Sequence, residues 1–370
     1  MNLSYWEYKT WLSHIDFTIV GSGIVGLNCA FQLKKKFPKA KILIIEKGIL
    51  PQGASTKNAG FACFGSISEI RADLKNHSEE EVLQLVQKRC DGVQLLRANL
   101  GDGAMDFQNH GGHEIFTAQQ AELYDDCLAS LARVNALLHP VFKGASFKKH
   151  KNSFHFKGIQ ENYISSDFES QLDTGKMMYS LLRLVQSKGI TILNAITVEN
   201  YTENAASVSI QTNLFEFVTK KLIVATNGFA AQLLSENVRP ARAQVLITKP
   251  IKNLPIIGTF HLDEGYYYFR NIQQRILFGG GRNLDFKTEE TTIFGETALV
   301  QETLERLLKE VILPDIPFEV DQRWSGIMGM GAQKRPIVKQ ISEHVYCGIR
   351  LGGMGIAIGS IIGKDLADLV

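Results

Sequence analysis

The sequence has no long apolar run, no low-complexity segment and no excess of one charge. It contains 40 Lys and Arg against 38 Asp and Glu, a net charge of +2 in 370 residues, and this balance gives no reason to expect a nucleic acid as partner. No run approaches twenty uninterrupted apolar residues, so no membrane span is expected. Residues 1–16 lack the apolar core of a signal peptide. We therefore expect a cytoplasmic protein.

Cysteine is scarce, and its positions follow no recognisable pattern. The five cysteines are odd in number, which argues against a disulfide framework, and their spacing is not that of a metal site. The nine histidines are scattered, and the pair His110 and His113 is typical of a solvated loop. No Ser-His-Asp, Cys-His or metal-ligand set stands out. The sequence predicts reduced thiols, no metal and no hydrolytic triad.

A glycine fingerprint follows the first apolar strand. Gly21, Gly23 and Gly26 have the spacing G-x-G-x-x-G directly after residues 17–20. The first glycine allows a tight strand-to-helix turn, the second lets a pyrophosphate approach the backbone, and the third lets the helix pack on the strand. The helix that starts near Ile24 directs its free N–H groups at the phosphates. This pattern predicts a dinucleotide site.

An acid at the end of the next strand completes the pattern. Glu46 follows the apolar residues 42–45 and comes twenty residues after Gly26, where an acidic side chain binds the ribose hydroxyls of a dinucleotide. An acid there disfavours a 2′-phosphate, so FAD or NAD is expected rather than NADP. The helix between the two strands is expected at 27–37.

The rest of the chain alternates helical and strand patterns. Helices are expected at 79–100, 118–138, 175–187, 296–311 and 356–369. Extended segments are expected at 147–159, 191–193 and 345–349, with a meander at 198–228 and a hairpin of 266–270 with 275–279. Segments of nucleotide-binding type occur at both ends and in the middle of the chain. This order predicts a discontinuous nucleotide domain with a second domain inserted twice.

Four further motifs accompany the fingerprint. They are Ala54-Ser-Thr-Lys-Asn-Ala-Gly60, Ile223-Val-Ala-Thr-Asn-Gly228, Pro240-Ala-Arg-Ala-Gln244 and Gly352-Gly-Met-Gly355. With them, almost the whole chain resembles the D-amino-acid oxidase family of flavoproteins, which includes glycine oxidase, sarcosine oxidase and D-amino-acid dehydrogenases. The resemblance implies an α/β fold with a discontinuous Rossmann-type FAD-binding domain of residues 1–75, 165–235 and 325–370. An inserted α+β substrate domain on a mostly antiparallel sheet would take residues 76–164 and 236–324.

The resemblance also implies that FAD is bound, and bound noncovalently. Relatives with a covalent link use a cysteine in the segment matching 324–333 or a histidine in the early loop, and this chain has neither. The turn before the last helix would face the pyrimidine edge of the flavin. The implied FAD-binding residues are Gly21, Gly23, Ile24, Gly26, Glu46, Lys47, Ser55, Thr56, Lys57, Asn58, Ala59, Gly60, Val198, Thr226, Asn227, Gly228, Gly353, Met354, Gly355 and Ile356.

The activity implied by the resemblance is removal of a hydride from a C–H bond next to an amine nitrogen, with oxygen or another electron acceptor downstream. The substrate would be a small amine or amino acid. The side chains that hold a substrate carboxylate in relatives are missing, because their positions fall on Met328 and near Ala357. Arg350 and Arg270 are the candidate replacements, since arginine binds a carboxylate through two parallel hydrogen bonds. Tyr268 is the expected active-site tyrosine.

Two alternatives remain open at this point. An NAD-dependent dehydrogenase would use the same Rossmann start. A flavin-holding subunit or tRNA-modification partner without amine chemistry of its own would explain the missing carboxylate anchors, although the neutral charge balance counts against RNA.

Overall fold

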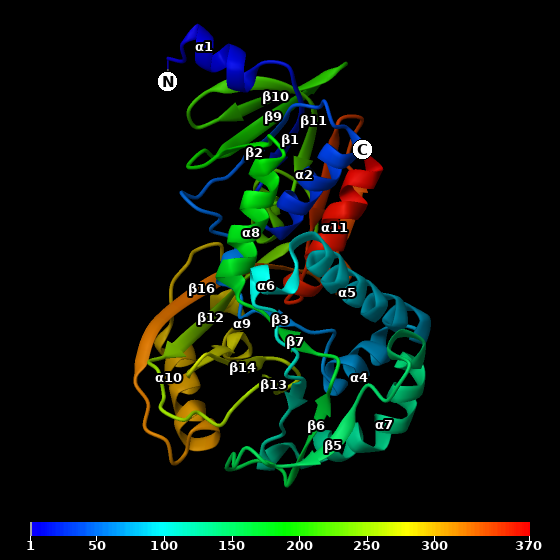
Figure 1. Cartoon of the computed structure of the whole chain (residues 1–370), viewed down its shortest axis with the longest axis vertical. Helices are drawn as coiled ribbons and strands as arrows, with labels where there is room; N and C mark the ends of the chain where they lie inside the picture. The colour runs from blue at the N-terminus through cyan, green and yellow to red at the C-terminus, as the bar shows by residue number, and fades with distance from the viewer. Residues whose placement is uncertain (1) are drawn as a thin grey trace.

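Two lobes, each built on an eight-stranded sheet, make up the molecule (Figure 1). The computed structural model describes residues 2–370. Both chain ends lie in the first lobe, and the second lobe occupies the other end of the long axis.

The first sheet has a parallel centre. β1 (Ile15–Val20) lies between β11 (Glu216–Val224) and β2 (Ile42–Ile45), and the three strands run in the same direction. β8 (Thr191–Leu193) and β18 (Val345–Ile349) extend the parallel run on either side. Both faces of this centre are covered, which explains why its inner strands consist mostly of Ile, Leu and Val.

Helices cover one face of this sheet, and smaller elements cover the other. Antiparallel partners complete its edges, namely β17 (Ile337–Gln340), β9 (Val198–Asn204) and β10 (Ser207–Thr212). The helices on the first face are α2 (Ile24–Lys36), α5 (Glu79–Leu100), α8 (Thr174–Ser187) and α11 (Gly355–Leu369). Their apolar side chains share one core with Ile19, Ile44 and Ile223. The β9–β10 meander and η3 (Asn227–Gln232) pack on the second face.

The second sheet is antiparallel apart from one parallel pair, β13 with β4. In spatial order its strands are β16 (Val320–Met330), β12 (Arg239–Thr248), β15 (Arg275–Gly280), β14 (Tyr267–Ile272), β13 (Thr259–Leu262), β4 (Gly112–Glu114), β6 (Asn162–Ser166) and β5 (Lys148–Lys151). One face packs on α10 (Ala298–Leu307) and η5 (Leu308–Ile312). The rings of Phe260 and Phe269 stack in this core, with centroids 4.5 Å apart.

Short elements connect the two sheets. At the β5–β6 end, α4 (Ile67–Asn76) and α7 (Ala121–Phe142) pack around Phe64. The remaining elements are α1 (Tyr5–Glu7), η1 (Tyr8–Leu12), α3 (Ala54–Lys57), β3 (Phe61–Ala62), α6 (Asp102–Met105), η2 (Ala118–Gln120), β7 (Ser170–Gln171), η4 (Arg282–Leu284) and α9 (Phe286–Glu289).

The fold class expected from the sequence is confirmed, and several bounds differ from the expected ones. The extended segment expected at 147–159 ends at Lys151, because the Asn152 side chain bonds the carbonyl of Phe156 and closes a turn. The helix expected to end at 138 continues to Phe142. Strands β6 and β16 both run across the domain boundaries expected at 164/165 and 324/325.

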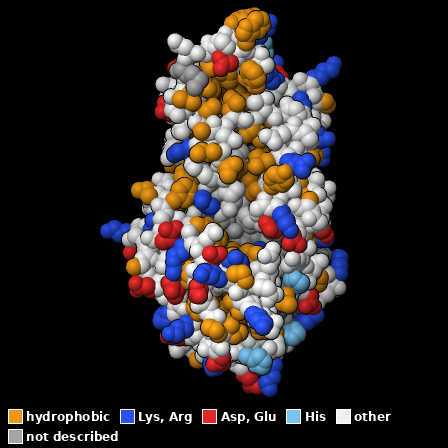
Figure 2. All heavy atoms as spheres, turned by 60° about the vertical axis from the view of Figure 1, so that its left-hand side comes forward, with side chains coloured by type: hydrophobic (Ala, Val, Ile, Leu, Met, Phe, Trp, Pro, Cys, Tyr) orange, Lys and Arg blue, Asp and Glu red, His pale blue; other side chains and the backbone are white. Residues whose placement is uncertain are grey.

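Exposed aromatic side chains gather at the amino-terminal end of the first lobe. Tyr5 and Trp6 are 65% and 68% exposed, and apolar side chains are visible at the end of the molecule where Figure 1 has α1 (Figure 2). Within residues 2–370, no helix combines the length and apolar character needed to cross a bilayer.

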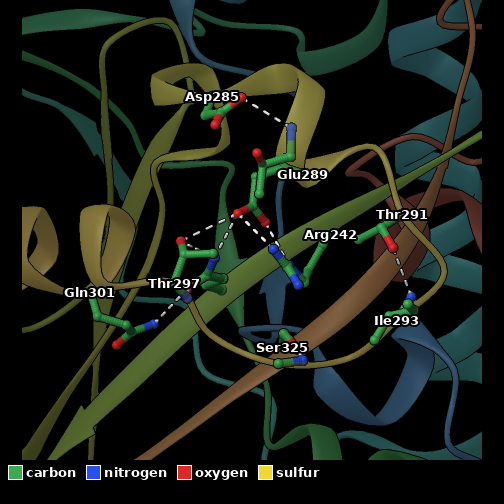
Figure 3. Close-up of polar contacts among 11 residues, drawn as sticks. Arg242, Asp285, Glu289, Thr291, Ile293, Thr297, Gln301 and Ser325 are labelled. Carbon is green, nitrogen blue, oxygen red and sulfur yellow. Dashed lines mark hydrogen bonds and ion pairs between the residues drawn. The ribbon is translucent and has the colours of Figure 1, made fainter.

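A buried ion pair fixes the chain segment between β15 and α10 to the second sheet (Figure 3). Arg242 of β12 donates from Nε and Nη2 to the two carboxylate oxygens of Glu289, at 2.8 and 3.0 Å. Gln244 Nε2 donates to the same carboxylate, and Gln244 Oε1 accepts from the backbone N–H of Thr297. Arg242 and Gln244 therefore hold segment 282–297 against β12.

We expect Glu289→Leu to lower the free energy of unfolding by about 3–5 kcal/mol, because it leaves the Arg242 guanidinium buried without its partner. Urea unfolding with excess FAD measures the change. The neighbouring pair Arg239–Glu290 is the matched control: its side chains are 61% and 48% exposed, so Glu290→Gln should cost less than about 1 kcal/mol. Equal costs for the two variants would contradict a structural role for the buried pair. The double variant Arg242→Met/Glu289→Leu should recover much of the loss.

Candidate functional site

The glycine fingerprint forms the turn between β1 and α2. Gly21 has φ of +104°, which L side chains rarely adopt. A Cβ on Gly26 would lie 2.0 Å from the carbonyl oxygen of Gly21, so the first turn of α2 can approach the strand only with glycine at this position. The amino end of α2 therefore opens at the carboxyl edge of the parallel sheet, beside Ile24.

Glu46 lies directly after β2 and is fixed from several sides. Its Oε2 accepts from the backbone N–H and hydroxyl of Ser22, at 2.9 and 2.7 Å, and its Oε1 accepts from Gly48 N. The side chain is 6% exposed. The carbonyl of Glu46 accepts from Ile196 N, which brings the start of β9 at Val198 close to the same strand end.

The early loop, residues 54–60, contacts both lobes. Ser55 Oγ accepts from the backbone N–H of Ile24 at 3.0 Å, at the amino end of α2. Asn58 bonds three backbone groups of the loop and accepts from Thr174 Oγ1 of α8 at 2.8 Å. On the other side, Trp324 Nε1 of β16 donates to the carbonyl of Lys57 at 3.0 Å.

Two further turns meet at the same edge of the first sheet. Asn227, which follows β11, accepts through Oδ1 from the backbone N–H of Leu351 at 3.1 Å, and this bond joins the turn after β11 to the turn after β18. Within residues 2–370, Thr226 Oγ1 is buried without a hydrogen-bond partner. Helix α11 begins at Gly355, and Met354 lies 3.6 Å (Sδ to Sγ) from Cys63.

The sequence-predicted cofactor residues thus converge on one edge of the first sheet. They follow the carboxyl ends of β1, β2, β11 and β18, the place where open parallel sheets bind dinucleotides. The amino ends of α2 and α11 supply partial positive charge there, and the orphan hydroxyl of Thr226 offers a polar contact. Lys47 is exposed, with its Nζ 6.0 Å from the ring centroid of Phe229. The Lys57 ammonium lies 5.1 Å from the ring centroid of Phe294.

The second sheet turns a polar face away from its aromatic core. Phe269 and Phe260 point into the core, so Tyr268 and Arg270 point to the opposite side of β14. His261 is directly opposite Tyr268, and Glu114 of β4 is opposite His261, which adds both to this polar face.

Burial shifts the pKa values of the groups on this polar face. It raises the pKa of Tyr268 to about 12 and that of Glu114 to about 7, the latter against two hydrogen bonds from Ser68. Burial alone would lower the pKa of His261, but Glu169, 3.1 Å away, together with Glu69 and Glu114 raises it to about 9.

Arg270 is the least satisfied cation on the polar face. It is 3% exposed, and its Nη1 makes one long bond of 3.4 Å to the carbonyl of Gly60. Its Nε is buried and has no hydrogen-bond partner within residues 2–370. Desolvation lowers the pKa of Arg270 to about 10, although the charges of Asp173 and Asp106 oppose this. A buried guanidinium with free donors is suited to binding an anion.

Arg350 is placed differently. Its backbone has φ of +62°, and its Nε and Nη2 donate to the carbonyl of Arg335 at 3.0 and 2.9 Å. Its Nη1 is directed at the carbonyl of Asn237 at 3.5 Å. Most donors of Arg350 are therefore already directed at the protein's own backbone, and Arg350 and Arg270 do not come together.

A family model described as FAD dependent oxidoreductase (DAO) matches residues 16–369. The chain belongs to this family. Its cofactor is accordingly FAD, and NAD-dependent dehydrogenation is no longer an alternative.

Individual relatives are distant. The probable oxidoreductase OrdL of Haemophilus influenzae is 19% identical over 385 residues, which cover 98% of this chain and 84% of that protein. The glycine oxidase structure from Geobacillus kaustophilus has a TM-score of 0.78 at 20% identity and covers 96% of this chain and 94% of its own. The L-proline dehydrogenase structure from P. horikoshii has a TM-score of 0.75 at 15% identity and covers 96% and 92%. At such identities the solved structures establish the common fold.

Three buried groups beside this edge of the first sheet could not be recognised as neighbours from the sequence. Cys63, His261 and Glu169 lie within a few ångströms of one another, although they are far apart in the sequence. Of the three, only His261 could have been noticed in the sequence. Its position in the alternating pattern of its strand places it on the same face as Tyr268 of the following hairpin.

We expect the FAD of this flavoprotein to be released by trichloroacetic acid into the supernatant. Segment 324–333 has Met328 and Met330 and no cysteine, and segment 55–60 has no histidine, so neither attachment point found in covalently linked relatives is available. Absorbance of supernatant and pellet after precipitation measures the partition. A yellow pellet would refute noncovalent binding.

Proposed function

We propose that this family member oxidises the carbon–nitrogen bond of an amino acid or secondary amine, of the kind that glycine, sarcosine or D-amino acids present. Bound FAD supplies the hydride acceptor, its N5. The protein's own residues bind and orient the substrate and exclude water. Glycine oxidase and L-proline dehydrogenase, two proteins with the same fold, carry amino-acid substrates in their names, which supports this substrate class.

The buried Arg270 is the observation that carries the proposal. It combines 3% exposure with an unpartnered Nε and a single long bond. A substrate carboxylate that accepted two parallel hydrogen bonds from this fork would satisfy it and fix the substrate's orientation. Arg270 also adjoins Gly60 of the early loop: a Cβ on Gly60 would lie 3.3 Å from Cζ of Arg270. We therefore favour Arg270 over Arg350 as the carboxylate anchor.

Tyr268 and Phe61 would form the apolar side of the substrate site. Their ring centroids are 5.7 Å apart in an edge-to-face arrangement, and Tyr268 is two residues from Arg270 on the same strand face. Since successive residues on one face are about 7 Å apart, a small amino acid would reach from the guanidinium to the tyrosine ring. Tyr268 would act by positioning the reacting carbon.

Most of the rate enhancement would come from the orientation of the substrate and from a cofactor environment that stabilises negative charge on the flavin. A substrate amine that arrives neutral needs no dedicated base before hydride removal, and the imine product hydrolyses in water. Residues 353–356 would aim the amino end of α11, with its partial positive charge, at the pyrimidine edge of the bound flavin. The reaction would therefore depend on geometry more than on a proton-transferring side chain.

We expect Arg270→Met to weaken anaerobic bleaching of the flavin by amino acids about 10- to 100-fold in apparent dissociation constant, since a hydrogen-bonded charge contributes about 1.5–3 kcal/mol. Reductive titration with glycine, sarcosine, D-amino acids and proline measures this. The corresponding amines without a carboxylate should bleach the variant and the wild type alike. Arg275→Met in the same hairpin is the control, because Arg275 pairs with Asp321 at the sheet edge.

Two outcomes would contradict the proposal at different levels. An equal loss for amines with and without a carboxylate would remove Arg270 as the anchor while leaving amine oxidation intact. A wild-type flavin that no amino acid, secondary amine or polyamine bleaches would instead favour a flavin-holding subunit without amine chemistry.

A further inference from the structure

Three buried side chains of different chemistry meet between the two lobes. Cys63 Sγ, a carboxylate oxygen of Glu169 and an imidazole nitrogen of His261 all lie within 4.8 Å of one another. The three residues are 6%, 2% and 5% exposed. They comprise one thiol, one carboxylate and one imidazole, and the function proposed above uses none of them.

The fold brings these groups together through strand pairing. Cys63 follows β3 and Glu169 precedes β7, and the antiparallel pair Ala62↔Ser170 sets the two side by side. His261 reaches them from β13, across the polar face of the second sheet. The Glu169 carboxylate lies over Gly112, where a Cβ would stand 1.9 Å from Oε2, so glycine in β4 makes room for it.

Hydrogen bonding leaves this cluster incomplete. His261 Nε2 and Glu169 Oε2 are 3.1 Å apart. Glu169 Oε1 is buried and has no partner within residues 2–370. Cys63 Sγ has one weak contact, 3.6 Å to the thioether of Met354. A buried carboxylate oxygen without a donor is costly, and a cation would satisfy it.

The surrounding charge favours a cation. Glu114 and Glu69 both act on His261 with the same sign as Glu169, and the Glu114 carboxylate is 3% exposed. Burial and the charges of Glu169 and Glu69 raise the pKa of Cys63, and the charge of Arg89 opposes them. Glu169 and Glu69, joined by Glu114 once it loses its proton, place negative charge around one imidazole, and this charge favours a divalent ion.

We propose that Cys63, Glu169 and His261 form a site for a transition-metal cation of the zinc type. Thiolate, imidazole and carboxylate are the ligands that Zn²⁺ takes, whereas Mg²⁺ and Ca²⁺ do not take thiolate. Two ligand atoms at 2.0–2.1 Å from a tetrahedral zinc lie about 3.3 Å apart, close to the 3.1 Å between His261 and Glu169. Three protein ligands leave a fourth position for water.

A cavity borders the cluster at Cys63. Cys63 lines a cavity of about 370 Å³ next to α5, together with Cys90, Arg97, Phe107 and Ser170. Binding releases two protons: the thiol of Cys63 becomes thiolate, and protonated His261 becomes neutral. The bound unit of divalent ion, thiolate, carboxylate and imidazole then carries no net charge, which suits a buried position.

The first test is metal retention by the purified flavoprotein. The protein is dialysed against a chelator, incubated with zinc chloride and desalted, and zinc and FAD are measured by mass spectrometry and absorbance. We expect about one zinc per chain, and less as the pH is lowered, because protons compete for the ligands. Metal content is read without turnover, so this result is independent of whether amines are substrates.

Matched variants identify the site. Cys63→Ser, Glu169→Gln and His261→Asn should each retain at least about tenfold less zinc while keeping wild-type FAD content. Cys90→Ser, in the same cavity and outside the cluster, should retain as much zinc as the wild type. Equal retention by Cys63→Ser and Cys90→Ser would overturn the proposal and indicate adventitious zinc.

A measurement on the wild type alone keeps the proposal testable if the variants do not fold. Cobalt(II) bound to a thiolate gives a ligand-to-metal charge-transfer absorption, which a difference spectrum against the same flavoprotein without cobalt isolates. We expect this band to saturate at about one cobalt per chain. Absence of the band, or no zinc retained after desalting, would mean that the cluster is a buried His–Glu ion pair beside a neutral thiol.

Discussion

The early loop, residues 54–60, is the constraint on which the arrangement of the two lobes depends. Its Ser55 hydroxyl is bonded to the amino end of α2, and its Lys57 carbonyl accepts from Trp324 of the second sheet. The carbonyl of Gly60 faces Arg270. One short segment therefore fixes the distance between the glycine turn after β1 and the polar face of the second sheet. In the hydride transfer proposed above, which would occur only at close range, this spacing would matter more to the reaction than any single side chain.

The sequence pattern within a few residues was enough to predict those elements whose conformation depends only on neighbouring residues. The β1–α2 turn needs glycine for reasons confined to a few residues, so Gly21 and Gly26 could be interpreted without knowledge of the rest. The same holds for α5, whose bounds follow from Ser78 as N-cap and Gly101 at its end. Family resemblance added the choice of FAD over NAD and the bounds of the two domains, which spacing alone could not have supplied.

The polar face of the second sheet and the groups beside it could not be predicted in the same way, because they depend on register between distant strands. Glu114 and His261 become neighbours only when β4 pairs with β13, across some 150 residues of chain. Cys63 and Glu169 depend equally on the short β3–β7 pair. Arg350 illustrates the opposite problem: its place before the glycine turn suggested a substrate-carboxylate anchor, yet at a positive φ its side chain donates to backbone carbonyls. Proximity in sequence gives no side-chain direction at such a position.

Positive and negative groups lie at different ends of the polar face, and this arrangement would fix the orientation of a bound substrate. Arg270 lies near the early loop with free donors, whereas Glu114, Glu169 and His261 lie toward β4. An amino acid whose carboxylate binds Arg270 would therefore place its amine on the side of the carboxylates. If a divalent ion neutralised those carboxylates, attraction for a protonated amine would fall and the neutral amine, the form that gives up a hydride, would be favoured. An ion bound between β13 and β7 would then lower the fraction of substrate amine that is protonated, although no side chain would accept the proton directly.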